Sequence, residues 1–107
     1  MQDFPLYNSL ELTCKHRDLT DCQKHDFFKN IQFIDQEGYK HIYSLIKIYS
    51  VKNDNCKQNI LPYNGIKNDQ DITFDMELLP LKLRQIIYKF TLKHIRKMEN
   101  ERKRYKY

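Results

Sequence analysis

Two cysteines and two histidines near the N-terminus have the side chains most able to hold a metal ion. Cys14, His16, Cys22 and His25 form the pattern C-x-H-x5-C-x2-H. Thiolates and imidazoles are ligands that zinc prefers in proteins. The spacer between His16 and Cys22 is short for a structural zinc site, and the alternative is one or two semi-buried thiols with solvent-facing histidines. We favour this second interpretation and expect no metal and no cofactor.

The remaining histidines lack the partners that catalysis needs. His41 and His94 have no evident partners for a catalytic triad. The chain also contains no Gly-rich phosphate loop, no nucleophile elbow and no paired-carboxylate motif. His94 falls on the apolar face of a predicted helix, where a packed or rim histidine is the more common finding. We therefore expect that this chain is not an enzyme.

Residues 71–77, DITFDME, have a different kind of chemistry, because acidic and apolar side chains alternate along them. In an extended strand, such alternation places the two kinds of side chain on opposite faces. The apolar set is Ile72, Phe74 and Met76, and the polar set is Asp71, Thr73, Asp75 and Glu77.

A lone strand cannot pair its own backbone amides and carbonyls. Either the loop predicted at 52–70 supplies a mate or another chain does. In the second case an added peptide strand would gain affinity from main-chain hydrogen bonds and selectivity from alternating pockets. Two structural alternatives stay open. The acids merely face water on a half-buried strand, or Phe74 is buried in the core and its removal unfolds the protein.

Three helices are expected around this segment, so the predicted fold is mostly α. Thr20 and Gln23 have the T-x-x-Q spacing of a capping box, which predicts a helix at about 20–33. Apolar residues at helical spacing predict a second helix at about 36–51 and a third at about 80–98. The acidic and apolar strand, alone or in a small hairpin, joins the second helix to the third.

The two ends of the chain are expected to lie outside the main domain, which spans 17–98. Residues 1–16 show no helical period and are predicted to form an irregular arm. Residues 99–107 are predicted to be a basic tail. The net charge is +5, and residues 93–107 account for all of it, with seven cations minus two acids. The tail residues that could contact nucleic acid are Arg102, Lys103, Arg104 and Lys106.

Cysteine usage and hydropathy bear on the compartment. The three cysteines have no disulfide-framework spacing, and the first residues lack the features of a signal peptide. No apolar stretch approaches the ~20 residues that a membrane span needs. We expect a reducing compartment, the cytosol or the nucleus, and no association with a membrane.

The order of these elements, with these residues, resembles the extra-terminal (ET or NET) domain. This domain follows the bromodomains of BET transcription proteins and also ends a yeast YEATS-domain subunit of chromatin complexes. The resemblance covers roughly 17–97. It includes the Thr20 capping box with Phe27 seven positions on, the segment 71–76, and the Leu79-Pro80 entry to the last helix. The matching apolar positions are Ile31, Ile34, Tyr39, Ile42, Tyr43, Leu45, Ile46, Leu83, Ile87, Tyr88 and Phe90.

The resemblance implies a non-enzymatic module that docks short peptides with alternating Lys and apolar residues. The peptide would lie beside the acidic segment as an added strand, and its lysines would meet the acids. Such exposed ion pairs contribute only ~0–1 kcal/mol each, so they tune selectivity and association rate more than affinity. The expected peptide-binding residues are Asp71, Ile72, Thr73, Phe74, Asp75, Met76 and Glu77, together with Tyr39, Ile42 and Tyr43.

The same resemblance implies an adaptor in nuclear chromatin or transcription complexes, from a chain that is a monomer when alone. The alternative function is a small basic structural subunit of a larger assembly, whose tail contacts nucleic acid. A subunit of that kind would be poorly soluble or partly unfolded without its partners. An ET-like module would instead be a folded monomer.

Overall fold

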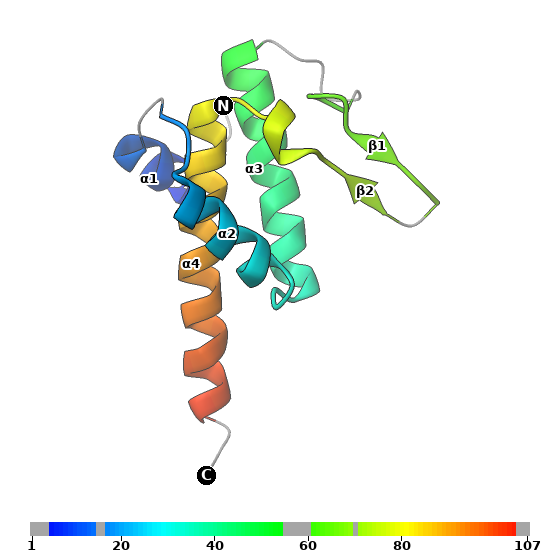
Figure 1. Ribbon diagram of the computed structural model, residues 1–107. Coiled ribbons are helices and arrows are strands. Elements are labelled where there is room, and N and C mark those ends of the chain that lie inside the picture. Colours follow the sequence, from blue (N-terminus) through cyan, green and yellow to red (C-terminus); the bar gives the residue numbers. More distant parts are fainter. Residues whose placement is uncertain (1–4, 15–16, 55–60, 70, 105–107) are drawn as a thin grey trace.

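Figure 1 shows the computed structural model, which describes residues 5–14, 17–54, 61–69 and 71–104. The α-helices in these ranges are α1 (Pro5–Thr13), α2 (Asp21–Ile31), α3 (Gln36–Asp54) and α4 (Leu81–Arg104). The strands are β1 (Ile66–Lys67) and β2 (Ile72–Thr73), followed by the 3-10 helix η1 (Met76–Leu78). The prediction of a mostly helical fold is confirmed, and the predicted strand takes the form of a small hairpin.

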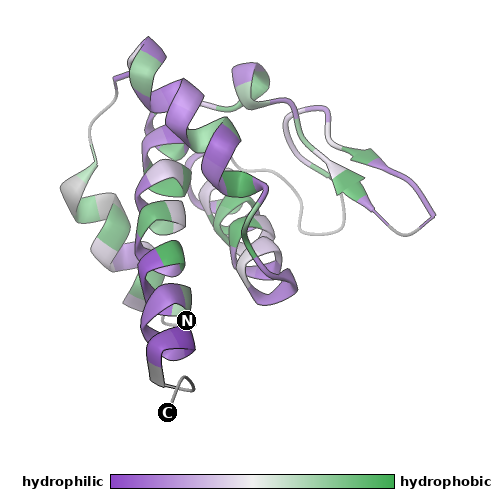
Figure 2. Cartoon of the chain, turned by 60° about the horizontal axis from the view of Figure 1, so that its bottom comes forward, coloured by the Kyte–Doolittle hydropathy of each residue, from purple (hydrophilic) through white to green (hydrophobic). Residues whose placement is uncertain are grey.

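The helix α4 is the centre of the bundle, because α1, α2 and α3 all pack against it (Figure 1). Buried apolar side chains recur along α4 at helical spacing and give it one continuous core face. The buried core residues of these helices are Leu83, Ile86, Ile87 and Phe90 on α4, Phe27 on α2, and Leu45, Ile46 and Tyr49 on α3. In Figure 2 hydrophobic and hydrophilic segments alternate along α4, whose C-terminal end is mostly hydrophilic.

Local sequence signals set where α2 and α3 begin. The Thr20 hydroxyl accepts the Gln23 backbone N–H at 3.1 Å, and the Gln23 side chain accepts the Thr20 N–H at 2.9 Å. The predicted capping box is therefore confirmed. Before α3, Asp35 Oδ1 accepts the Gly38 N–H at 2.8 Å. A carboxylate here satisfies a helical donor that has no partner within the helix, and it lies at the positive end of the helix dipole.

Residues 5–13 form the helix α1, so the prediction of an irregular arm over 1–16 is wrong for this segment. Tyr7 and Leu10 are both buried, each with 1% of its surface exposed. The Tyr7 hydroxyl also accepts a hydrogen bond from the Asn53 side chain at 3.3 Å. A nine-residue helix with two core side chains is too short to show a clear helical period, and packing rather than propensity stabilises it.

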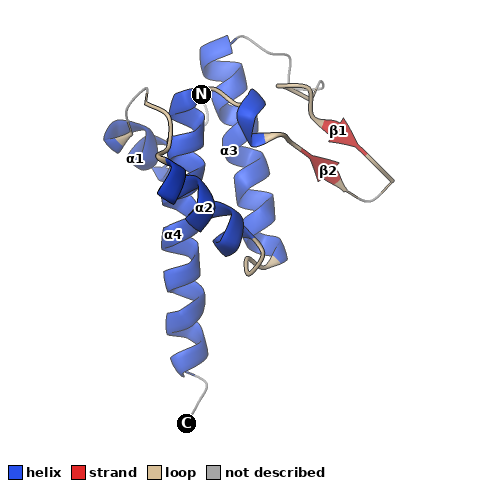
Figure 3. Ribbon diagram, viewed as in Figure 1, coloured by secondary structure: helices blue, strands red, loops and turns tan. Residues whose placement is uncertain are grey.

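The loop predicted at 52–70 supplies the mate for β2. Its first residues continue α3, and a later part forms β1. β1 pairs with β2 in antiparallel register, with Ile66 opposite Thr73 and Lys67 opposite Ile72. Figure 3 shows this hairpin projecting sideways from the helical bundle.

The alternation predicted an extended strand over 71–77, but the chain is not extended over the whole of this segment. It leaves the strand after Thr73 and turns into η1, which begins at the buried Met76. Asp75 caps this turn, because its Oδ1 accepts the Glu77 N–H at 3.0 Å. The alternation of side chains therefore ends in a capped turn that points Met76 into the core.

A tight turn at 62–65 leads into β1. Its left-handed backbone falls on Tyr63 and Asn64, with φ of 54° and 57°. Gly65 is needed for a different reason. A Cβ atom there would lie 2.6 Å from the ring of Phe74, so only glycine lets this ring approach the backbone of the turn.

The helix α4 continues to Arg104, beyond the predicted end at 98. The tail predicted at 99–107 is therefore helical through Arg104, and Lys106 lies outside the described residues. In Figures 1 and 3 the C-terminal part of α4 projects past the other elements.

Candidate functional site

A groove lies between α3 and the β2 segment. Its volume is about 930 Å³, and its walls come from seven residues of α3 and from four residues at 71–74. Seven of the ten residues predicted to bind a peptide line it. They are Tyr39, Ile42, Tyr43, Asp71, Ile72, Thr73 and Phe74.

Aromatic and apolar side chains form the floor of this groove. The Phe74 ring lies 6.4 Å from the Tyr43 ring, and both are only partly buried. Phe74 and Ile42 also pack against the hydrophobic core from the groove side. Phe74 is thus neither a fully buried core residue nor a free surface residue. At the rim, Tyr39 is 47% exposed, and its hydroxyl donates to the Ile31 carbonyl at 2.7 Å.

The backbone of β2 presents an unpaired edge. The Asn68 N–H donates to the Asp71 carbonyl at 2.8 Å, so these two residues form a hydrogen-bonded pair. Ile66 and Thr73, two positions further along the ladder, belong to the same class of pair, and Lys67 and Ile72 lie between the two pairs. In an antiparallel pair, residues that exchange hydrogen bonds alternate with residues whose N–H and C=O point away. Ile72 is in the second class, so its backbone N–H and C=O point away from β1. In the described ranges the sheet has two strands, so no further strand covers this edge.

The charges at the groove are asymmetric. Asp71 contributes a carboxylate from the β2 side, and the exposed Lys40 contributes a cation from the α3 side. Asp75 is exposed just past the groove, where one of its oxygens already accepts a backbone N–H. The β2 side of the groove therefore attracts cations, whereas the α3 wall does not.

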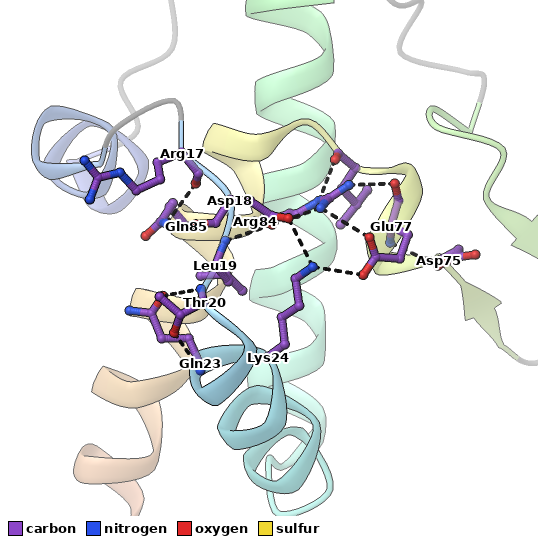
Figure 4. Close-up of polar contacts among 11 residues, drawn as sticks. Arg17, Asp18, Leu19, Thr20, Gln23, Lys24, Asp75, Glu77, Arg84 and Gln85 are labelled. Atoms are coloured by element: carbon purple, nitrogen blue, oxygen red, sulfur yellow. Dashed lines mark hydrogen bonds and ion pairs between the residues drawn. The ribbon is translucent and has the colours of Figure 1, made fainter.

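Glu77 and Met76 lie away from the groove. Met76 is buried in the core, and the Glu77 carboxylate forms ion pairs with Lys24 at 3.3 Å and with Arg84 at 3.4 Å. The sequence-based assignment of these two residues to a peptide site is not supported by their positions. Figure 4 shows Glu77 turned toward Lys24 and Arg84.

Arg84 is the centre of this polar cluster (Figure 4). Its guanidinium donates to Asp18 Oδ1 at 2.9 Å, to the Glu77 carbonyl at 2.6 Å and to the Leu79 carbonyl at 2.9 Å. Asp18 also pairs with Lys24 at 3.0 Å, and this hydrogen bond, together with Arg84, lowers the pKa of Asp18. The cluster ties the start of α2 and η1 to the first turn of α4.

Sequence reasoning missed this cluster. The available signal was Arg84 itself, because it interrupts the apolar face between Leu83 and Ile86. A buried arginine requires acidic or carbonyl partners, yet the pattern does not say which ones. Its partner Asp18 lies 66 positions away in the sequence. We assign the cluster a structural role.

A second polar contact joins α4 to the start of α3. His94 is buried, and its Nε2 lies 2.8 Å from Asp35 Oδ1. This hydrogen bond, together with the one from the Gly38 N–H, lowers the pKa of Asp35. The His94 ring stacks on Phe90 at 5.3 Å. The prediction that His94 is a packed histidine is therefore confirmed.

The candidate zinc ligands that the structure describes lie in different surroundings. Cys14 is buried after α1, whereas Cys22 and His25 are exposed on α2. His16 lies outside the described residues. Within the described ranges no three histidine, cysteine or acidic side chains are placed to share a metal ion.

The residues predicted to contact nucleic acid belong to the end of α4. Arg102 and Lys103 are exposed there, Arg104 ends the helix, and Lys106 is outside the described residues.

None of the helices within the described ranges is long and apolar enough to cross a membrane.

Comparison with protein-family models, with curated proteins and with solved structures gave no match.

Proposed function

We propose that this chain is a non-enzymatic docking module, which binds short peptides of alternating lysine and apolar residues in the groove between α3 and β2. One observation carries the proposal: the unpaired backbone edge of β2 borders an apolar groove. Each feature alone is common in small proteins. Together they provide both the main-chain donors and acceptors and the side-chain pockets that strand addition requires.

The binding geometry follows from the register of the hairpin. A peptide strand beside β2 would exchange hydrogen bonds with the N–H and C=O of Ile72. Alternate peptide side chains would then enter the groove and contact Tyr43 and Phe74. The side chains between them would lie near Asp71 and Asp75, which favours lysine at those positions.

The short strand limits the affinity. β2 has two residues, so it offers few main-chain hydrogen bonds. An interface of this kind falls in the class of small and transient contacts, below about 1,200 Å² of buried surface. Apolar contacts in the groove supply most of the binding free energy, and the acids favour lysine-containing partners.

The resemblance to the ET domain supports this proposal. The capping box of α2, the groove residues on α3, the hairpin and the entry to α4 follow one another in the ET-like order. On this basis we propose that the chain works as an adaptor in nuclear chromatin or transcription complexes and that it is a monomer alone. In this proposal α1 is an addition that packs against α4 of the ET-like bundle.

The sharpest test uses modified peptides rather than protein variants, so that folding is not disturbed. A short peptide of alternating lysine and isoleucine is N-methylated at one amide at a time, and each affinity is measured by an amide chemical-shift titration. Strand addition predicts a loss of affinity at every second amide, because only alternate amides face β2. The intervening amides serve as matched controls. Uniform losses, or shifts that avoid both the 71–74 segment and α3, would contradict the proposal.

A further inference from the structure

We propose that α4 carries a second interaction surface, which binds the phosphate backbone of duplex nucleic acid independently of the peptide groove. The surface is the basic face of α4. Its residues are Lys93, Arg96, Lys97, Asn100 and Lys103. The last four lie three, four, seven and ten residues after Lys93, and this spacing places all five on one side of a helix. All five are exposed.

The basic face surrounds a shallow hollow. This hollow has a volume of about 380 Å³ and is lined by four residues of the face together with Glu101. All of its lining residues belong to α4, so no second element of the described chain encloses it. A hollow with walls from one helix cannot enclose a small molecule. It suits instead a broad anionic surface that the helix can lie against.

The charges on this face have few partners within the protein. In the described part of the chain, Lys97 pairs with Glu37 at 3.7 Å, and both side chains are more than half exposed. Such an exposed pair holds its cation only weakly. Lys93, Arg96 and Lys103 have no acidic side chain within ion-pair distance among the described residues. Their charges are therefore available to an outside anion.

The helix dipole does not explain this distribution. Cations are stabilised at a helix C-terminus only within about the last turn. Lys97 lies seven residues before Arg104, and Arg96 and Lys93 lie further still. At 3.6 residues per turn these three cations lie about two to three turns before the helix ends. A role outside the fold accounts for them better than a role in capping α4.

The dimensions and the chemistry fit nucleic acid. From Lys93 to Lys103 the helix rises roughly 15 Å, at 1.5 Å per residue. Duplex DNA presents one negative charge per ~1.7 Å of its axis, so this length faces several phosphates. Arginine, lysine and asparagine are all donors to phosphate oxygens. Four cations of the face stand against one carboxylate, that of Glu101, which lines the same hollow.

This binding should be independent of base sequence and of the peptide groove. Contacts to phosphates position a protein on the duplex but carry no base information. The basic face belongs to the C-terminal half of α4, whereas the groove lies between α3 and β2, and the two surfaces share no lining residue. We therefore expect that one molecule can bind a duplex and a peptide at the same time.

The test measures binding of a fluorescent DNA duplex by anisotropy over a series of salt concentrations. The variant is Lys93→Gln/Arg96→Gln/Lys97→Gln, and the matched control is Lys29→Gln/Lys67→Gln/Lys82→Gln, which loses the same formal charge elsewhere. Four phosphate contacts predict a slope of log K against log salt of about −3.6 for the unmodified chain. The basic-face variant should lose at least about tenfold in affinity at low salt, and its slope should fall by about 2.7 in magnitude.

The control triple variant should keep most of the affinity and the slope of the unmodified chain. Equal losses in both triple variants would show only a general effect of net charge and would overturn the proposal. It would also be overturned by no binding at low salt, or by stronger binding to poly-glutamate or to anionic vesicles than to the duplex. Circular dichroism of each variant checks that α4 remains helical.

Discussion

The backbone N–H of Asn68 donates to the carbonyl of Asp71 at 2.8 Å, and this bond fixes the direction in which β2 presents its backbone. Paired and unpaired positions alternate in an antiparallel ladder, so Ile72 turns its own N–H and C=O outward. A slip of the hairpin by one residue would turn Ile72 toward β1 instead. The short connection between the strands therefore controls which groups a peptide can meet.

The contact between Gly65 and Phe74 gives the first prediction. In Gly65→Ala the new Cβ would lie 2.6 Å from the Phe74 ring, so the ring must move within the groove. We expect peptide affinity to fall by about three- to tenfold, since overpacking costs about 1 kcal/mol or more. Isothermal titration calorimetry measures the change. Asn64→Gly, in the same turn, is the control and should leave affinity within about twofold; an unchanged affinity in Gly65→Ala would show that the ring position does not matter.

Truncation of Phe74 gives the second prediction and separates the groove from the core. Phe74 is half-buried, so Phe74→Ala should cost about half of the 3–5 kcal/mol typical of a fully buried phenylalanine. The protein should remain folded by circular dichroism but bind the lysine and isoleucine peptide much more weakly. Phe90→Ala, at a fully packed position on α4, is the comparison and should cost the full amount. An unfolded Phe74→Ala would make Phe74 a core residue rather than a groove residue.

The opposite charges of Asp71 and Lys40 give the third prediction. Asp71→Lys should weaken binding of a lysine-containing peptide, and Lys40→Glu should strengthen it, because the two residues face the groove from opposite sides. Each change should be worth about 1 kcal/mol or less and should act mainly on the association rate. Stopped-flow measurements at low and high salt separate rate from affinity. Effects of the same sign in both variants would contradict this assignment of charges.

The sequence predicted the elements that have strong local signals. The T-x-x-Q spacing at Thr20 located the start of α2, and the alternation at 71–74 located β2. Both signals act over a few residues, where side-chain geometry and backbone conformation are tightly coupled. The predicted groove residues on α3, which are Tyr39, Ile42 and Tyr43, came instead from the resemblance to the ET domain.

The elements that the sequence did not predict depend on contacts between distant residues. α1 forms because Tyr7 and Leu10 pack on the bundle, and a short helix shows no period of its own. Arg84 finds Asp18 across 66 positions, and no local pattern encodes that pairing. Glu77 was predicted to bind a peptide because it alternates with apolar residues. That local pattern does not indicate its ion pair with Arg84, which turns it away from the groove.

Removal of Arg84 gives the fourth prediction. Arg84→Ala removes the guanidinium from two backbone carbonyls and from Asp18 and Glu77, which both keep their ion pair with Lys24, so it should destabilise the fold by about 1–3 kcal/mol. The chain has no tryptophan, so urea unfolding is best followed by circular dichroism. Lys82→Ala, on the same turn of α4, is the control and should change stability by no more than about 0.5 kcal/mol. If Arg84→Ala also lowered the free energy of unfolding by no more than about 0.5 kcal/mol, water would replace the guanidinium at its partners.

The hydrogen bonds to Asp35 give the fifth prediction, which concerns pH. The bond from His94 and the one from the Gly38 N–H lower the pKa of Asp35 below its ordinary value of 3.8. A carboxyl whose pKa is lowered by folding stabilises the folded state above the pKa of the unfolded chain. That contribution is lost as the pH falls through the lower pKa of the folded state. The acid side of the stability curve should therefore fall steeply below pH 3.8.

Two variants isolate the share of this loss that belongs to Asp35. Asp35→Asn keeps a capping oxygen but has no proton to bind, so its stability should fall less than that of the unmodified chain below pH 3.8. Asp18→Asn should remove a separate share, because the pKa of Asp18 is also lowered, chiefly by Lys24. Urea unfolding at a series of pH values measures both. Parallel curves for Asp35→Asn and the unmodified chain would show that the contact between His94 and Asp35 does not couple protonation to folding.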